Sequence, residues 1–318
     1  MELNCEGCAG CCLDWRPLGG VHASDASVNS GDSSPVVPDH ERRGRYRALD
    51  ATYNLVPLTR DEVRAFLDSG YGDVLVPRLF ESFADDPGRA VTVDGHEVAA
   101  MGERPLFLVG LRKHPKPVAP FGHDPVWLDA CAFLDPETLQ CRVHGDDLYP
   151  ETCGTYPGRN LDLDRETECE RVEAAHGDPG ERLQDRSVPE DLPPPAFGPQ
   201  ALGSTVFAYP EPDDLRGVVA RLEAGESTRE DRALFVGAAA GSAPGMAEVN
   251  EDRAEEAREL ARDADSWVGR AASEWAAAAE SAGGPGASAE DAPDPYRVEE
   301  DRGAPPTPGW DALYGDGS

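Results

Sequence analysis

The chain has 318 residues, with 61 Asp and Glu against 29 Lys and Arg, and a formal net charge of -32. No apolar run approaches the ~20 residues that a membrane span needs, which excludes an integral membrane protein, and the net charge argues against nucleic-acid binding through phosphate contacts. The acidic residues are scattered along the chain rather than gathered in one block, a pattern typical of a surface adapted to high salt.

A cysteine motif opens the chain, with Cys5, Cys8, Cys11 and Cys12 close together. No basic n-region or apolar h-region accompanies it, so we expect no Sec-type export and a cytoplasmic, reducing location. Residues 22–48 are rich in Ser, Asp, Gly and Arg without an apolar period. They predict an exposed insertion.

Local signals between the two groups of cysteines predict a short antiparallel sheet and helices. Thr59 and Glu62 have the spacing of a capping box, which predicts a helix through Leu67 that stops at Gly70. A second helix is expected over residues 74–83. Asp94-Gly95 between two β-rich runs is typical of a hairpin, and residues 106–111 predict a further strand.

The second group comprises Cys131, Cys141, Cys153 and Cys169, with 9, 11 and 15 residues between successive members. Together the two groups define an expected metal-binding domain over residues 1–178. Residues 179–200 are rich in proline and predict a linker.

The rest of the chain predicts a helical region over 201–282 and a disordered acidic tail over 283–318. Within the tail, residues 310–314 have the composition of a short docking motif. The helical region carries apolar residues at helical spacing, which we expect to face a core. These are Leu215, Val218, Val219 and Leu222, and, in a helix expected over 250–281, Leu260, Ala261, Ala264, Trp267, Val268, Ala271 and Trp275.

Cysteine number and spacing indicate metal binding rather than disulfides in a reducing compartment. Two residues between cysteines let both thiolates face one ion, and Gly7 and Gly10 leave room for the turn. Adjacent Cys11 and Cys12 point to opposite sides of an extended backbone, so a site with one metal ion rarely uses both. The eight cysteine thiolates would satisfy two four-ligand sites or one multinuclear centre. A bacterial ferredoxin is disfavoured, because its run places three residues before the fourth cysteine.

Ligand counting leaves the metal open, because all-sulfur sites suit zinc and iron–sulfur chemistry alike. The expected cofactor is therefore zinc or iron, with an iron–sulfur cluster included. His144 is a further candidate ligand, although a histidine that simply packs in the core or on the surface is commoner.

The cluster resembles the YkgJ family of cysteine cluster proteins, described as a zinc- or iron-chelating domain with a C-x2-C-x2-C-C signature. Residues 131–134, 141–144 and 150–157 are similar to later segments of the family pattern, with Tyr149 and Gly154 where the family usually has arginine. The resemblance covers about residues 1–175. It implies metal ligation by Cys5, Cys8, Cys11, Cys12, Cys131, Cys141, Cys153 and Cys169.

We therefore expect an α+β fold: a small irregular metal-stabilised cysteine-cluster domain with a short antiparallel sheet and helices, plus a helical C-terminal region. The expected function is binding of zinc, iron or an iron–sulfur cluster through clustered thiolates, with a metal ion as partner and neither membrane nor nucleic acid.

Two alternatives stay open. A lysine methylase-like enzyme is implied by some relatives in the cysteine-cluster group, but no Gly-rich loop follows a strand to hold S-adenosylmethionine. A cytosolic thiol redox protein would suit the Cys5-x2-Cys8 spacing, but no thioredoxin-like βαβ pattern surrounds it. No catalytic set can be selected from the sequence, so we expect a binding protein rather than an enzyme.

Overall fold

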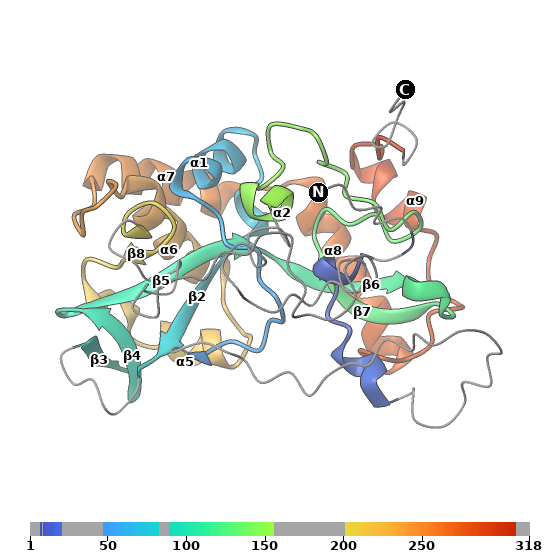
Figure 1. Cartoon of the computed structure of the whole chain (residues 1–318), viewed down its shortest axis with the longest axis horizontal. Helices are drawn as coiled ribbons and strands as arrows, with labels where there is room; N and C mark the ends of the chain where they lie inside the picture. Colours follow the sequence, from blue (N-terminus) through green and yellow to red (C-terminus); the bar gives the residue numbers. More distant parts are fainter. Residues whose placement is uncertain (1–6, 8, 21–46, 83–88, 156–200, 310–318) are drawn as a thin grey trace, which may run out of the picture.

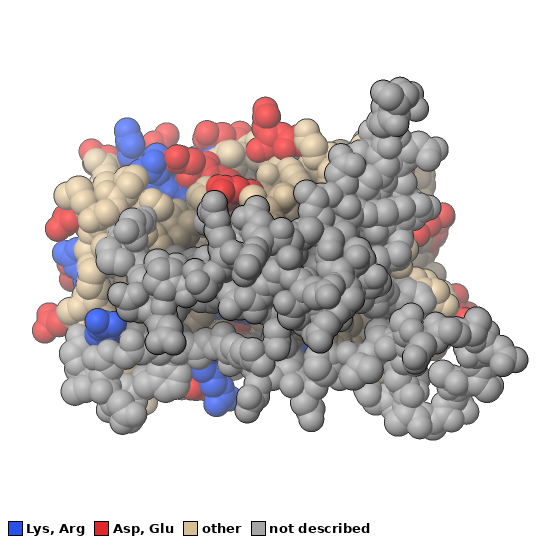
Figure 2. Space-filling view, in the orientation of Figure 1, with Lys and Arg blue, Asp and Glu red and all other residues tan. Residues whose placement is uncertain are grey.

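The computed structural model describes residues 7, 9–20, 47–82, 89–155 and 201–309 (Figure 1). Most of the expected insertion and the whole of the expected 179–200 linker lie outside these ranges, as do Cys5, Cys8, Cys169 and residues 310–314. On the face shown in Figure 2, acidic side chains appear at separate places around the rim rather than in one patch.

The larger of two sheets is antiparallel and curls into a half-barrel (Figure 1). Strands β2 and β5 form its longest ladder, from Leu75 opposite Leu111 to Leu79 opposite Phe107. Its strands are β1 (Arg47–Ala48), β2 (Leu75–Glu81), β3 (Ala90–Val93), β4 (His96–Met101), β5 (Arg104–Leu111) and β8 (Phe207–Ala208).

A second, two-stranded sheet follows directly along the chain. It consists of β6 (Lys113–Val118) and β7 (Val126–Cys131), which pair antiparallel. Only Arg112 separates β5 from β6, and its backbone N–H donates to Val74 O at 2.8 Å. The segment Gly286–Ala289 extends this sheet, because Trp127 N donates to Ala287 O at 2.9 Å and Gly286 N donates to Trp127 O at 2.7 Å.

Helices pack against both sheets (Figure 1). Helix α6 (Arg229–Gly241) contacts β2 and β5 and lies along α7 (Glu251–Asp263), while α8 (Trp267–Ala282) packs on β6. The remaining helices, including single 3₁₀ turns, are η1 (Gly10–Cys12), η2 (Arg16–Gly20), α1 (Arg60–Asp68), η3 (Gly72–Val74), η5 (Pro120–Gly122), α2 (Glu151–Thr155), η8 (Pro212–Leu215), α5 (Val218–Glu223), α9 (Pro295–Val298) and η9 (Glu300–Arg302). None of the described helices combines the length and the apolar character needed to cross a bilayer.

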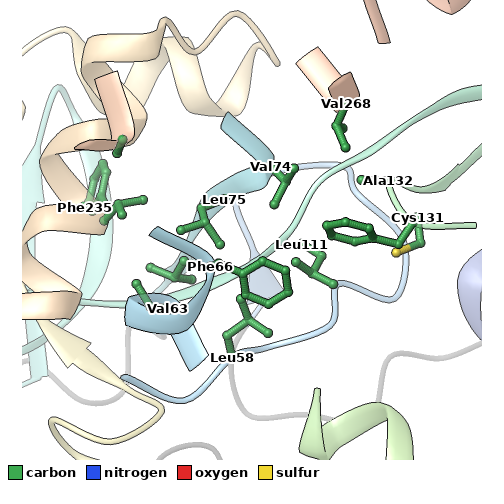
Figure 3. Close-up of a cluster of buried hydrophobic side chains, with 14 of the residues drawn as sticks. Leu58, Val63, Phe66, Val74, Leu75, Leu111, Cys131, Ala132, Phe235 and Val268 are labelled. Atoms are coloured by element: carbon green, nitrogen blue, oxygen red, sulfur yellow. The ribbon is translucent and has the colours of Figure 1, made fainter. Parts of the chain in front are cut away.

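One hydrophobic core runs through both sheets and the helices over them. Figure 3 shows part of it, where Phe66 of α1, Leu111 of β5 and Val268 of α8 surround the same interior. The fold-class prediction was therefore wrong. Burial of large apolar side chains from segments far apart in sequence organises the described part of the chain, not a small metal-stabilised domain.

Several local predictions are confirmed by the structure. Thr59 caps α1 in a capping box with Glu62. The hairpin turn at Asp94-Gly95 joins β3 to β4, with φ of 55° at Asp94 and 82° at Gly95. The strand expected over 106–111 lies within β5, and Leu215, Val218, Val219 and Leu222 are buried.

Two predicted helices were wrong. Residues 75–81 form strand β2, in which Pro77 lies opposite Val109, and proline opposes a helix interior because it lacks an N–H and clashes with the preceding turn. The helix expected over 250–281 is instead two helices, because Ser266 caps a new helix and accepts a hydrogen bond from Val268 N at 3.2 Å. Leu260 of the expected core stripe is exposed, while the other members are buried.

The prediction of disorder from Gly283 was also wrong for residues 283–309. This segment contains α9 and η9, extends the β6–β7 sheet, and buries Val298 and Glu299 completely. Apolar content is low in this stretch. Burial of Ala289, Val298 and Ala304 in the core holds it in place, together with hydrogen bonds and ion pairs to distant segments, which a compositional argument does not register.

Candidate functional site

Cys12 is positioned next to Cys131 by backbone pairing. The bridge between Leu13 and Ala130 is antiparallel, so the residues on either side of it, Cys12 and Cys131, are neighbours in the same register. Asp14 N extends the pairing by donating to Asp129 O at 2.7 Å. Cys12 is half-buried at the end of η1, whereas Cys11 in the same turn is exposed.

Cys131 and Cys141 flank a loop that begins at the end of β7. An isolated antiparallel bridge joins Leu134 to Cys141 and returns the loop toward its origin. Cys131 is buried in the hydrophobic core, and Cys141 is half-buried against it (Figure 3 shows the Cys131 sulfur). The fourth cysteine, Cys153, lies half-buried on α2.

Helix α2 is tied to the segment that leads into α1. Thr152 Oγ1 donates to Pro57 O at 3.0 Å, and Glu151 N donates to the Glu62 carboxylate at 2.7 Å. These contacts hold Cys153 at the same face of the molecule as the other three thiols.

The four thiols influence one another electrostatically. Burial raises the pKa of Cys12 well above its usual value, and the neighbouring Cys131, Cys141 and Cys153 raise it further. Burial, reinforced by Cys131, raises the pKa of Cys141 to about 12. Burial and then Cys131 and Cys141 also raise the pKa of Cys153. At neutral pH all three groups are protonated thiols.

Lys113 provides positive charge beside these thiols. It lies opposite Cys131 in the β6–β7 ladder, and its ammonium group donates to Leu13 O at 3.2 Å. Burial lowers the pKa of Lys113, an effect opposed by Cys12, Cys131 and Asp14. Sequence analysis missed this residue, although a signal existed: Lys113 and Lys116 are the only lysines in the chain, and both lie on β6.

Lys116 anchors the loop that carries Cys131 and Cys141. Its fully buried ammonium group donates to Ala132 O at 3.0 Å and to Leu134 O at 2.6 Å. Arg142, next to Cys141, donates through Nε to Glu299 at 3.1 Å. The C-terminal segment therefore helps to fix the cysteine loop through Glu299.

The described cysteines do not form a metal centre in this structure. Among the described residues, no group of three or more His, Cys, Asp or Glu side chains is arranged to hold a metal ion. His144 stands apart as well: its ring packs on Tyr149 with centroids 4.6 Å apart, and burial lowers its pKa.

The fold and the site together define a class: an α+β protein with a curled antiparallel sheet, in which Cys12, Cys131, Cys141 and Cys153 share one face. The chain belongs to the family of unknown function DUF7531, whose model matches residues 1–311. No curated protein and no solved structure matches the chain.

The resemblance to the YkgJ family was wrong, because the family match spans nearly the whole chain and is to DUF7531, and because the described residues contain no clustered cysteine metal site. A short cysteine spacing and a few aromatic–proline pairs can recur in unrelated folds.

Proposed function

We propose that this protein binds zinc or iron through cysteine thiolates, in the reducing environment of the cytoplasm. One observation carries the proposal: the antiparallel bridge between Leu13 and Ala130 brings Cys12 beside Cys131. Neighbouring cysteines also help to raise the pKa values of Cys12, Cys141 and Cys153. Cys5, Cys8 and Cys169 are proposed as additional ligands on sequence grounds alone. Metal binding would draw the thiols together and release their protons.

The raised thiol pKa values argue against thiol redox chemistry. Disulfide exchange requires a thiolate that is populated near neutral pH, and redox-active cysteines have lowered pKa values for that reason. Cys141, with its pKa at about 12, has the opposite property. A divalent cation is a much stronger source of positive charge than a lysine and deprotonates its thiol ligands on binding.

Lys113 supports the same proposal. Several thiolates around one divalent ion leave excess negative charge, which is costly to bury. An ammonium group opposite Cys131 would offset part of that charge. The lysine methylase alternative was an implication of the YkgJ resemblance, and no feature of the described residues favours it.

The test is metal analysis of the full chain purified anaerobically at high salt, with a visible spectrum to separate an iron–sulfur centre from zinc. We expect stoichiometric metal in the wild type and a loss of at least half of it in Cys12→Ser and Cys141→Ser. Ala276→Ser is the control, because it introduces a serine at an exposed position of α8 without removing a thiol. Metal-free folded protein with titratable thiols, or full metal content in both cysteine variants, would refute the proposal.

A further inference from the structure

Cys12 and Cys131 come from segments far apart in the sequence and lie opposite each other. The antiparallel bridge between Leu13 and Ala130 puts the two cysteines that flank it in register. Opposite residues of an antiparallel pair have Cα atoms about 4.5–5.5 Å apart. A disulfide joins residues whose Cα atoms are about 4.4–6.8 Å apart. The backbone pairing therefore holds this pair at a separation that a disulfide can span.

Hydrogen bonds on both sides of β7 fix the pairing around Cys131. On one side, Ala132 N donates to Arg112 O at 3.0 Å. Because successive residues of an antiparallel strand bond to opposite neighbours, the backbone groups of Cys131 are directed away from β6. On that other side, Asp14 N donates to Asp129 O at 2.7 Å. Cys131 thus faces the segment that carries Cys12.

The two thiols differ in their access to solvent. Cys12 is half-buried and packs against the hydrophobic core that contains Cys131, which is only 6% exposed. After burial, the neighbouring Cys131 has the largest effect among the charged and thiol groups that raise the pKa of Cys12. A small oxidant in solution can therefore reach Cys12 first, with Cys131 in place behind it.

The other described cysteines are not in register with Cys131. Cys141 lies opposite Leu134 in its own antiparallel bridge, and Cys153 is on α2. Cys11 is exposed and is one residue further from the pairing. Among the described residues, Cys12 is therefore the cysteine that backbone pairing aligns with Cys131.

We propose that Cys12 and Cys131 form a reversible disulfide when the protein is exposed to a peroxide, and that this modification switches off metal binding at the cysteine face. Peroxide converts the Cys12 thiol to a sulfenic acid and leaves as one water. The Cys131 sulfur then attacks the Cys12 sulfur, the S–S bond forms, and the hydroxyl leaves with the Cys131 proton as a second water. Two thiols lose two electrons in total, and one peroxide is reduced. A thiol reductant returns the pair to its starting state.

The raised pKa values affect the rate of this reaction rather than the alignment of the pair. Disulfide chemistry proceeds through the thiolate, so a high pKa makes the step slow. The pair is therefore suited to a response to sustained oxidation, not to repeated catalytic turnover. Disulfides that form in reducing compartments are usually transient and redox-sensing.

The test is peptide mapping of the full chain after treatment with hydrogen peroxide at high salt, with the remaining thiols alkylated before digestion. Protein as purified and protein treated with a chelator are both used, because bound metal shields its thiolate ligands. We expect chelator-treated wild type to lose two of its eight thiols. Tandem mass spectrometry should assign the cross-link to Cys12 and Cys131, and dithiothreitol should restore both thiols.

Cys12→Ser and Cys131→Ser should each abolish this cross-link. Cys11→Ser is the matched control, because it makes the same change in the same turn, and it should form the cross-link at the wild-type rate. Circular dichroism of the reduced variants separates loss of the cross-link from loss of folding. Absence of the Cys12–Cys131 cross-link in chelator-treated wild type, or its loss in a folded Cys11→Ser variant, would overturn the proposal.

Metal content of the same samples separates this inference from the proposed function, on which its second part rests. Metal released in step with the cross-link supports the switch, and a cross-link that forms while all the metal is retained overturns it. Protein that binds no metal but forms the cross-link would refute metal binding and leave the disulfide standing. Metal-binding protein that forms no cross-link after chelation would refute the disulfide alone.

Discussion

Lys116 Nζ lies 2.7 Å from Glu299 Oε1, and neither side chain has any exposed surface. The Glu299 carboxylate also accepts hydrogen bonds from Trp275 Nε1 at 3.0 Å and from Arg142 Nε at 3.1 Å. One carboxylate near the C-terminus therefore joins β6, the cysteine loop and α8. Removing a single member of such a group leaves the others charged and buried without compensation.

Glu299→Gln should destabilise the protein by about 3–5 kcal/mol, because Lys116 would keep its buried charge without a counterion. Arg142 would retain Asp135 and Glu300, each at 3.5 Å. The measurement is denaturant unfolding at constant high salt. Glu290→Gln serves as the control, since Glu290 is exposed and the variant makes the same charge change in the same segment. A difference of less than about 1 kcal/mol between the two variants would contradict the interpretation.

Lys116→Met combined with Glu299→Gln should cost less than the sum of the two single changes. The two side chains are in direct contact, and contacting residues have coupling free energies of about 0.5–3 kcal/mol. The double-mutant cycle is measured by the same unfolding experiment. Simple additivity would show that the pair does not interact in solution.

Truncation after Ala282 should abolish cooperative unfolding or reduce the stability by several kcal/mol. The truncated chain loses the backbone pairing of Trp127 with Ala287 and the whole Glu299 group. Truncation after Gly309 is the control, because it retains each of these contacts. Circular dichroism and limited proteolysis report the result, and equal protease resistance in the two truncated chains would refute it.

His114 should make folding stability depend on pH below neutrality. Its side chain is buried, both ring nitrogens lack hydrogen-bond partners within the described residues, and burial together with the facing Lys116 and Arg112 lowers its pKa well below the usual value. The unfolded chain takes up a proton near pH ~6.5 while the folded chain does not. The stability of the folded protein is therefore unaffected by His114 above pH ~6.5. Below that pH the free energy of unfolding falls by up to about 1.4 kcal/mol per pH unit, because only the unfolded chain binds the proton.

The measurement compares the wild type with His114→Leu between pH 8 and pH 5. The variant should lose this part of the slope, while the two curves run parallel above pH ~7, where the histidine is neutral in both states. Parallel curves over the whole range would show that the pKa of His114 is the same in the folded and the unfolded protein, and would contradict the prediction.

Thr59→Ala should reduce stability by about 1 kcal/mol, because it removes the hydroxyl that accepts from Glu62 N at the start of α1. Thr59→Ser should retain most of the wild-type stability, since it keeps the accepting oxygen. Thr92→Ala, on an exposed part of β3, is the control for losing a threonine that caps no helix; its hydroxyl donates to the Glu97 side chain at 2.8 Å. Equal unfolding midpoints for Thr59→Ala and Thr59→Ser would contradict the capping role.

Elements specified by adjacent residues could be predicted from the sequence. The capping box at Thr59 and the Asp94-Gly95 turn act through contacts of a few residues, and both are present. The sequence-based prediction failed where contacts with residues far away in the sequence determine the structure. Residues 75–81 form a strand because β5 pairs with them, and Glu299 is buried because Lys116, Arg142 and Trp275 surround it.

The candidate cysteines could be chosen from the sequence, but their arrangement could not. Cys12 and Cys131 are brought together by the bridge between Leu13 and Ala130, which no local pattern indicates. Spacing left open which cysteines share a site, and the structure places Cys12 beside members of the second group.

The outer edge of β7 is covered by both ends of the described chain. Asp14 N pairs with Asp129 O near one end of the strand, while Ala289 N pairs with Pro125 O near the other. During synthesis, the segment around Asp14 leaves the ribosome long before β7, and the segment around Ala289 leaves long after it. Until the later segment is available, the nascent chain exposes an unpaired strand edge, which is a template for association with other chains. This layer therefore cannot be completed when β7 itself emerges, and association with other chains is most favoured in that interval.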